Sequence, residues 1–444
     1  QSDSRDAGAG SLYCCIVGES HDGHEHAAAA LRAGAVALVV ERDVADVAAD
    51  VVRIVVNDSR RATGLFAAAF HGMPSRQMTV VGITGTNGKT TTAHLLASIF
   101  RAAGRDTRII GTLTGVRTTP DAVELQRMLA GFRAEGAQVV VMEVSSHALA
   151  LHRVAGMHFA AAVFTNLGHD HLDFHGTVER YFAAKAALFD PRLSAIGVVN
   201  RDDVHGRLLI DGAALPIVSF GIDDASDVQA SVVDHSFDWK SSQLRVRLGG
   251  HFNVLNSLAA ATTAAALGVA SGDIDRGLAA VAPVPGRFEN VDIDRDFAVI
   301  VDYAHTPEAL ARVLESARRV AASGRVVVVF GCGGGRDARK RPDMGAVATR
   351  DADAVVLTSD NPRHEDPAAI IADIERGIPA GRRAVLVAVE EDRRAGIARA
   401  LAEARSGDVV VVAGKGHETT QTLADREVPF SDAAVVRELT GVAA

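Results

Sequence analysis

The first feature of this sequence that could do chemistry is a glycine-rich turn between an apolar segment, residues 79–84, and a segment with helical spacing, residues 90–102. In such a turn the glycines let backbone N–H groups close on phosphate oxygens, and the helix N-terminus adds positive potential. Lys89 can reach the β and γ phosphates of a nucleotide, and the Thr90 hydroxyl can bind Mg²⁺. A tight turn without a ligand is the competing interpretation. A turn without a ligand would not require the sequence Gly-Lys-Thr-Thr at this place. We therefore expect an ATP site at Gly85, Thr86, Asn87, Gly88, Lys89, Thr90 and Thr91.

Two later segments carry polar residues that could complete this site. Glu143 ends the apolar run 139–143, and a carboxylate at a strand end beside a phosphate loop is a natural Mg²⁺ ligand. Taken alone, helix capping or an ion pair explains Glu143 equally well. Residues 165–175 include His169, Asp170, His171, Asp173 and His175, which resemble a metal cluster, although an ordinary surface turn explains most of them.

A third polar segment is TSDNPRHEDP, residues 358–367, which follows the apolar run 354–357. It is expected at the carboxyl end of a buried strand, where open α/β sheets bind their ligands. A guanidinium there, with its backbone restricted by Pro362, can grip a carboxylate in two parallel hydrogen bonds. The alternative is a turn in which Arg363 pairs with Glu365 or Asp366.

The elements that must position these residues alternate along the chain. Apolar, β-branched runs ending in Gly, Asp or Asn are followed by alanine-rich segments with helical spacing, which predicts an α/β fold with parallel sheets covered by helices. The segments 71–76 and 283–287 interrupt this alternation with glycine and proline. We therefore expect three domains, 1–77, 78–286 and 287–444.

Composition limits the function classes. The 444 residues exceed one hydrophobic core, and a net charge of −9 without a long basic run argues against a nucleic-acid partner. Cys14, Cys15 and Cys332 have no metal-ligand spacing, which favours a reducing, cytoplasmic setting. The apolar runs have strand length, so no membrane span is expected.

Six motifs in order resemble the Mur ligases, the ATP-dependent amide-forming enzymes of peptidoglycan synthesis. They are Thr84–Thr91, Glu143–Ser146, Asn166–Asp173, Phe252–Ser257, Gly286-Arg287 and Asp302–His305. The resemblance extends over nearly the whole chain. Within the family the sequence looks like the MurE type, which adds the third residue of the stem peptide. The motifs for this type are Arg117–Pro120, His175–Lys185, Gly414–Glu418 and the loop 358–367.

The resemblance implies a small α/β domain that binds the uridine nucleotide, a central phosphate-loop ATPase domain and a Rossmann-like C-terminal domain that binds the amino acid. It implies that ATP converts the D-glutamate γ-carboxylate of UDP-MurNAc-L-Ala-D-Glu to an acyl phosphate, which meso-diaminopimelate then attacks. It also implies a monomer. A lysine-adding MurE, a folylpolyglutamate-synthase-like ligase and a catalytically dead homologue are the alternatives.

The resemblance also assigns residues. The catalytic set is Lys89, Glu143, His171 and Lys185, with two Mg²⁺ ions held through Thr90, Glu143, His171 and Lys185, the last as a carbamate; a lone helical lysine is otherwise a solvated side chain. Further nucleotide contacts fall on Asn166, Asn253, Asn256, Arg287 and Asp302. The residues assigned to binding of the uridine nucleotide and the dipeptide are Asp3, Ser4, Arg5, Thr118, Thr119, Ser145 and Arg153. The resemblance assigns diaminopimelate binding to Arg336, Asp360, Asn361, Arg363, Gly414 and Glu418.

Overall fold

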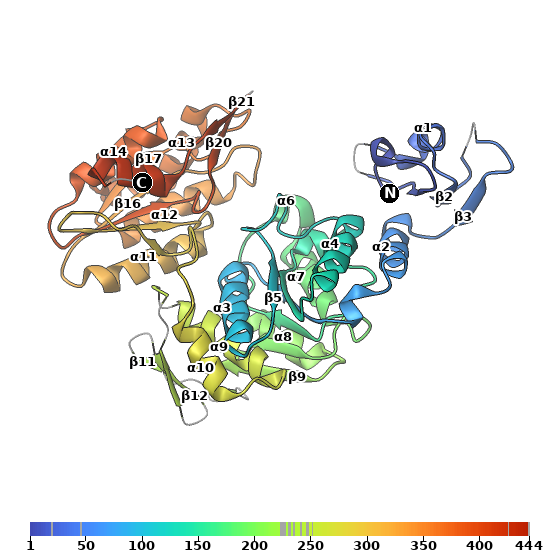
Figure 1. The fold of residues 1–444 in the computed structure, drawn as a ribbon. Helices are drawn as coiled ribbons and strands as arrows, with labels where there is room; N and C mark the ends of the chain where they lie inside the picture. The colour runs from blue at the N-terminus through green and yellow to red at the C-terminus, as the bar shows by residue number, and fades with distance from the viewer. Residues whose placement is uncertain are drawn as a thin grey trace.

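The computed structural model describes residues 1–444 except 19–20, 45–46, 223–227, 230–231, 234–235, 240–241, 246–247, 251, 425 and 443–444. Its principal sheets are parallel and covered by helices, as the sequence predicted. Figure 1 shows the N-terminal part, in blue, on one side of the central part and the C-terminal part, in orange and red, on the other. In the described part of the chain, no helix is both long enough and apolar enough to span a lipid bilayer.

The N-terminal part is a three-stranded parallel sheet with two helices. The elements are β1 (Leu12–Cys14), β2 (Ala37–Val40), β3 (Val52–Val55), α1 (Ala27–Arg32), α2 (Ser59–Phe70), η1 (Ser4–Asp6), η2 (Gly23–His26) and η3 (Pro74–Arg76).

The central part is built on a seven-stranded sheet with the order β10-β9-β8-β7-β4-β6-β5, in which every pair is parallel. Its strands are β4 (Thr79–Thr84), β5 (Thr107–Ile110), β6 (Val139–Glu143), β7 (Ala161–Phe164), β8 (Gly197–Asn200), β9 (Ile217–Gly221) and β10 (Val228–Gln229). The strands β11 (Val232–Val233), β12 (Ser236–Trp239) and β13 (Ser242–Arg245) form a separate antiparallel sheet.

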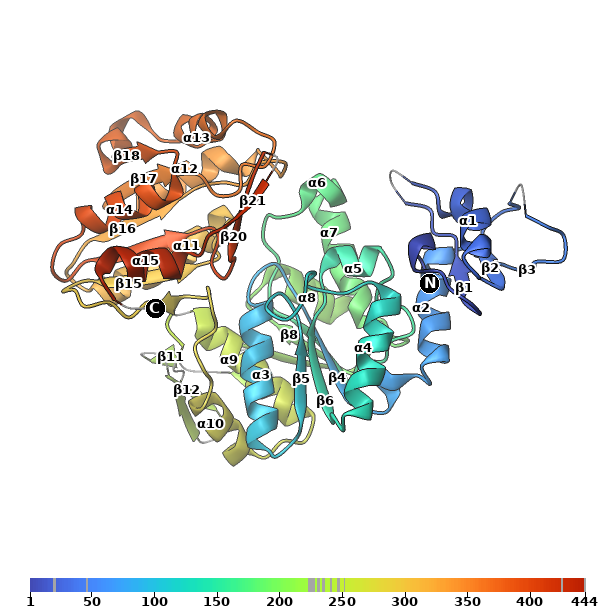
Figure 2. The same cartoon turned by 45° about the horizontal axis from the view of Figure 1, so that its top comes forward.

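Helices bury both faces of this sheet (Figure 2). They are α3 (Lys89–Ala102), α4 (Ala122–Ala134), α5 (Ser146–Ala150), α6 (Leu172–His175), α7 (Val178–Ala186), η4 (Ala187–Phe189), α8 (Val204–Gly212), α9 (Phe252–Ala266) and α10 (Ser271–Ala279). The valine-rich strands β4 and β6 are buried along nearly their whole length, as expected for a parallel sheet with two covered faces.

The C-terminal part has a six-stranded sheet with the order β14-β15-β19-β16-β17-β18, parallel except for β14. Its strands are β14 (Glu289–Asn290), β15 (Ala298–Asp302), β16 (Val326–Phe330), β17 (Ala354–Thr358), β18 (Leu386–Glu390) and β19 (Val409–Ala413), followed by the hairpin β20 (Thr420–Leu423) and β21 (Arg426–Pro429). The helices are α11 (Pro307–Ala321), α12 (Lys340–Asp351), α13 (Pro367–Arg376), α14 (Arg393–Glu403), α15 (Asp432–Thr440) and the 3-10 turn η5 (Ala380–Val385).

Residue 77 lies between η3 and β4, and residue 286 lies between α10 and β14. Each position separates one of the large parallel sheets from the next. We propose domain boundaries at these two residues.

Candidate active site

The glycine-rich turn connects β4 to α3 and has a conformation that requires glycine. Gly85 and Gly88 have positive φ angles of 151° and 87°. A Cβ atom would lie 1.9 Å from Thr165 Oγ1 at Gly85 and 2.4 Å from Asn256 Oδ1 at Gly88. The Lys89 ammonium lies under the turn and donates to the carbonyls of Gly85 and Thr86, both at 2.9 Å. The loop is thus closed around its lysine.

Asn166, from the segment after β7, holds this loop in place. Its Oδ1 accepts from Asn87 N at 3.0 Å, and its Nδ2 donates to Asn87 O at 3.1 Å. Its backbone carbonyl accepts from Thr86 N at 2.9 Å. The structure therefore brings the predicted Asn166 directly to the predicted phosphate loop.

Glu143 lies at the carboxyl end of β6 and is 1% exposed. The Thr90 hydroxyl is 3.0 Å from each of its carboxylate oxygens, and Thr112 N donates to Oε1 at 2.8 Å. Arg287, in the segment between α10 and β14, donates from its Nη2 to Thr90 Oγ1 at 3.2 Å. Among the residues that the structure describes, neither a helix cap nor an ion pair, the two alternatives, involves the Glu143 carboxylate. Hydroxyl and backbone N–H donors surround it.

Lys185 is buried in α7, which rules out the interpretation as a solvated surface lysine. Its ammonium donates to Gly85 O at 2.8 Å, the same carbonyl that Lys89 uses, and lies 4.5 Å from the Tyr181 ring centroid. Burial lowers the pKa of Lys185 well below its ordinary value, and the charge of Lys89 lowers it further. The lowered pKa favours loss of the proton relative to an exposed lysine.

His171 packs edge-on against the same tyrosine, with the ring centroids 6.1 Å apart. It has a positive φ of 54°, and its Nε2 lies 3.4 Å from Asp170 Oδ2. Burial lowers the pKa of His171 to about 3, so the imidazole is neutral. Among the residues described, no three His, Cys, Asp or Glu side chains are grouped closely enough to hold a metal ion.

A cavity of about 320 Å³ lies between the central and C-terminal parts. Of the predicted nucleotide contacts it is lined by Asn87, Gly88, Thr91, Asn166, Asn256, Arg287 and Asp302. Asn253 does not line the cavity; it is fully buried and accepts from Asn256 Nδ2 through its Oδ1 at 2.8 Å. Asp302 accepts from Phe288 N and Ala304 N at 2.7 Å each, and burial raises its pKa.

A second cavity, of about 870 Å³, lies between the N-terminal and central parts. Asp3, Ser4, Arg5 and Arg153 line it, together with Arg60 and Arg117. Thr118, Thr119 and Ser145 lie outside this lining. Thr119 Oγ1 instead donates to Glu143 O at 2.9 Å and accepts from Ser145 N at 3.0 Å. These side chains connect the loop after β5 to the end of β6.

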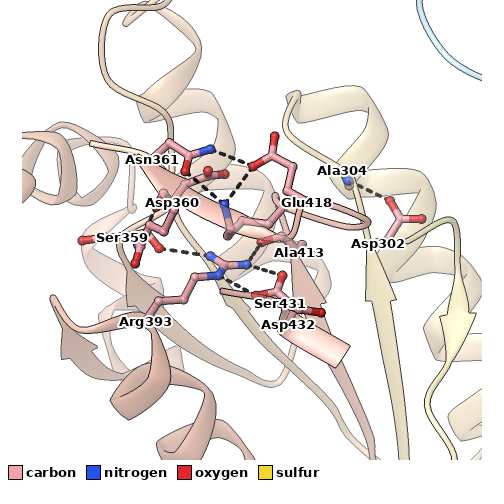
Figure 3. A network of polar contacts seen from close by, with 12 residues as sticks. Asp302, Ala304, Ser359, Asp360, Asn361, Arg393, Ala413, Glu418, Ser431 and Asp432 are labelled. Atoms are coloured by element: carbon pink, nitrogen blue, oxygen red, sulfur yellow. Dashed lines mark hydrogen bonds and ion pairs between the residues drawn. The ribbon is translucent and has the colours of Figure 1, made fainter. Parts of the chain in front are cut away.

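A buried polar network surrounds the carboxyl ends of β17 and β19 in the C-terminal part (Figure 3). Asn361 Nδ2 donates to Glu418 Oε2 at 2.8 Å, and Asp360 lies beside them. Gly414 has a φ of 116°, and a Cβ there would lie 2.7 Å from Asp360 Oδ2. Four of the predicted amino-acid contacts therefore meet at this strand edge.

Arg363 and Arg336 belong to the two loops beside this network. Arg363 is half-buried, with a φ of 53°, and its Nη1 donates to Gly334 O at 2.6 Å. Arg336 is exposed. Glu365 accepts from Gly335 N and from Arg341 Nη2, and Asp366 caps α13. The alternative pairing of Arg363 with Glu365 or Asp366 is therefore wrong.

Sequence reasoning missed several residues that hold the site together. Lys415 lies inside the quoted motif 414–418, and its place after the buried strand β19 was the available signal. Arg393 is fully buried and pairs with Asp432 in a bidentate ion pair, while also donating to Ser359 O and Ala413 O. No motif distinguishes Arg393 from the neighbouring surface arginines of α14.

Comparison with known proteins matches three consecutive regions of the chain. Residues 1–71 match the Mur ligase family catalytic domain, residues 83–264 the Mur ligase middle domain, and residues 286–416 the Mur ligase glutamate ligase domain. Among solved structures, one of a UDP-N-acetylmuramoyl-L-alanyl-D-glutamate–2,6-diaminopimelate ligase aligns with a TM-score of 0.70 and 33% identity, over 99% of this chain and 94% of that one. Folylpolyglutamate synthase of Mycobacterium tuberculosis, at 18% identity and a TM-score of 0.64, covering 86% of this chain and 95% of that one, shares the fold alone.

Relatives of similar length carry the same name as that ligase. The protein from Geobacillus thermodenitrificans is 44% identical over 98% of this chain and 93% of its own length. The one from Streptomyces avermitilis is 44% identical over 98% and 91%, and the one from Aquifex aeolicus 42% identical over 99% and 92%. This chain belongs to the Mur ligase family.

Proposed function

We propose that this ligase adds meso-2,6-diaminopimelate to UDP-N-acetylmuramoyl-L-alanyl-D-glutamate, with ATP converted to ADP and phosphate. The observation that carries the proposal is the pairing of Glu418 with Asn361 at the strand edge that also presents Arg363. A carboxylate and a guanidinium on one edge match the distal ammonium and carboxylate of diaminopimelate. The names of the relatives support the same substrate.

The nucleotide would occupy the cavity between the central and C-terminal parts. A phosphate in the loop 85–91 would meet backbone N–H groups and the N-terminus of α3. Lys89 would exchange its two carbonyl acceptors for phosphate oxygens, and Arg287 would approach from the C-terminal part. Positioning and charge neutralisation supply most of the catalysis in such phosphoryl transfers.

Mg²⁺ fits the donors found at Thr90 and Glu143. It prefers oxygen ligands and usually binds through one or two carboxylates, water and substrate phosphates, so a cluster of three acidic or histidine side chains is not required. When bound, it would neutralise charge on the transferred phosphoryl group. A second ion would lie toward His171 and Lys185.

We also propose that Lys185 carries a carbamate. Its lowered pKa makes the unprotonated amine, the form that takes up carbon dioxide, more accessible than in an exposed lysine. The modification would replace a second ammonium beside Lys89 with an anion, and so would remove the repulsion between two cations that share Gly85 O.

The uridine nucleotide would occupy the cavity between the N-terminal and central parts, with Ser4, Arg5 and Arg153 on its wall. Thr118, Thr119 and Ser145 would lie along the path toward Glu143. Diaminopimelate would contact Arg336, Asp360, Asn361, Arg363, Gly414 and Glu418. We propose a monomer that acts in the cytoplasm.

Phosphate release tests this function against the alternatives. UDP-N-acetylmuramoyl-L-alanyl-D-glutamate with meso-diaminopimelate, ATP and Mg²⁺ is expected to release phosphate in an amino-acid-dependent reaction. Release only with a pteroylglutamate and glutamate would instead support folylpolyglutamate synthesis. Absence of release with either acceptor would support a catalytically dead homologue.

A further inference from the structure

Lys415 is a completely buried lysine in the turn that follows β19. Its ammonium donates to Asn361 Oδ1 at 3.0 Å, to Glu418 Oε2 at 2.8 Å and to Thr420 O at 2.7 Å. A lysine ammonium has three N–H donors and no acceptor. All three donors are therefore used inside the protein, and none remains for a substrate.

These bonds fix which way Asn361 faces. Because the ammonium can only donate, the atom of Asn361 beside it must be the carbonyl oxygen. Thr422 N also donates to this Oδ1, at 2.9 Å. The amide nitrogen then points at Glu418 Oε2, 2.8 Å away. Lys415 and Thr422 N together set the orientation of an amide whose two ends could otherwise exchange places.

The same bonds fix the Glu418 carboxylate. Its Oε2 accepts from both Lys415 and Asn361. Within the described parts of the chain, no group donates to Oε1. Burial alone would raise the pKa of Glu418, but the charge and hydrogen bonds of Lys415 and Asn361 outweigh burial and lower it. One oxygen of an ionised carboxylate is left for a cation from outside.

We propose that Lys415 is a positioning residue for amino-acid selection: it holds Asn361 and Glu418 so that Glu418 Oε1 is presented to the distal ammonium of the substrate. The inference rests on the proposed function, because it takes the substrate ammonium from it. Lys415 does not touch the substrate. A purely structural lysine, tying the turn to β20, would affect stability without selecting among substrates.

The test compares Lys415→Met with a matched change at the opposite end of the same sheet. Arg325 precedes β16 at its amino end and pairs with Asp408 at 2.8 Å and Glu403 at 3.5 Å. Lys415→Met is expected to raise the KM for meso-diaminopimelate at least tenfold, with the KM for ATP within about twofold of wild type. Arg325→Met is expected to lower the melting temperature and leave both KM values unchanged.

A double variant shows whether Lys415 acts through Glu418. If it does, Lys415→Met combined with Glu418→Gln has about the KM for meso-diaminopimelate of Glu418→Gln alone, because coupled residues are not additive. If the increase in this KM in the double variant were instead the product of the increases in the two single variants, the inference would be overturned. So would a KM for meso-diaminopimelate in Lys415→Met that changes no more than the KM for ATP.

If Lys415→Met does not fold, Lys415→Gln replaces it, since an amide keeps two donors on a shorter side chain; the same outcomes apply. Failure of the wild type to use meso-diaminopimelate would contradict the proposed function and, with it, this assignment. Wild-type turnover with an unchanged KM in the variant would contradict the positioning role alone.

Discussion

At the scale of single residues, the site depends on side chains whose partners fix their charge. Lys89 and Lys185 share the Gly85 carbonyl. Burial lowers the pKa of Lys185, and the nearby charge of Lys89 lowers it further. Arg363 is half-buried, and among the described residues its guanidinium donates to one backbone carbonyl, Gly334 O. Its charge is therefore available for a substrate carboxylate.

Arg363→Lys is expected to raise the KM for meso-diaminopimelate roughly tenfold to a hundredfold, because an ammonium cannot reproduce two parallel hydrogen bonds and charged bonds contribute about 1.5–3 kcal/mol. Nucleotide binding is expected to survive, since the nucleotide cavity does not include Arg363. Steady-state kinetics and nucleotide titration measure the two effects. Arg376→Lys, on the exposed side of α13, is the control. If Arg363→Lys weakened nucleotide binding as much as it weakened meso-diaminopimelate binding, the assignment would be contradicted.

Lys185→Ala is expected to lose nearly all activity, which chloride or short carboxylates such as formate would restore in part by supplying the missing anion. Turnover measured over a series of anion concentrations checks this. An undiminished variant, or a loss that no anion reverses while the protein remains folded, would argue against a carbamate.

At the scale of elements, a histidine cluster ties α5, α6 and α7 together beside the phosphate loop. His175 is buried, and its Nε2 lies 2.9 Å from Ser146 Oγ. His147, Tyr181, Asp173 and Lys185 face it from the three helices. Burial, with the charges of His147 and Lys185, lowers the pKa of His175 to about 4.

This lowered pKa predicts a pH-dependent stability. Between pH 6.5 and about 4, the unfolded chain binds a proton at His175 that the folded protein does not, so stability falls as the pH falls through this range. His175→Gln is expected to have a shallower decrease in melting temperature from pH 6.5 to pH 4.5. His364→Gln, exposed in the C-terminal part, serves as the control. An identical slope in wild type and His175→Gln would be evidence against this source of acid sensitivity.

The elements were largely predictable, whereas their contacts were not. The apolar segment 79–84 has the bounds of β4, and the apolar run 354–357 forms all but the last residue of β17, because β-branched runs flanked by turn residues favour strands. The position of Lys415 after a buried strand was visible in the sequence, but its contacts were not, since its three acceptors come from residues up to 54 positions away. The positive φ of Arg363 likewise depends on tertiary contacts, with its N–H bound to Thr422 O.

At the scale of the whole molecule, the candidate site is assembled from two cavities, each lying between two neighbouring parts of the chain. The nucleotide cavity takes its lining from both the central and C-terminal parts, and Arg287 connects them through Thr90. His305 Nε2, in the C-terminal part, lies 3.7 Å from Asp170 Oδ2, in the central part, and gives a second contact between them. A nucleotide bound in this cavity would therefore stabilise both parts together.

A non-hydrolysable ATP analogue with Mg²⁺, at a hundred times its dissociation constant, is expected to stabilise the wild type by about 2.7 kcal/mol. At the same analogue concentration, Arg287→Ala is expected to gain clearly less, because it loses the contact from the C-terminal part. Thermal melting with and without the analogue measures both gains. Arg108→Ala, in β5, is the control, and an equal gain in all three proteins would refute the role of Arg287.

The central claim is that Arg363 and Glu418 select an amino acid with a carboxylate and an ammonium at its far end. The most direct measurement is amino-acid-dependent ADP formation with UDP-N-acetylmuramoyl-L-alanyl-D-glutamate, compared for meso-diaminopimelate, L-lysine and L-ornithine. A site built to bind a carboxylate rejects analogues that leave its guanidinium unpaired. The predicted result is a kcat/KM for meso-diaminopimelate at least about a hundredfold above that for L-lysine; equal turnover of L-lysine would contradict the account.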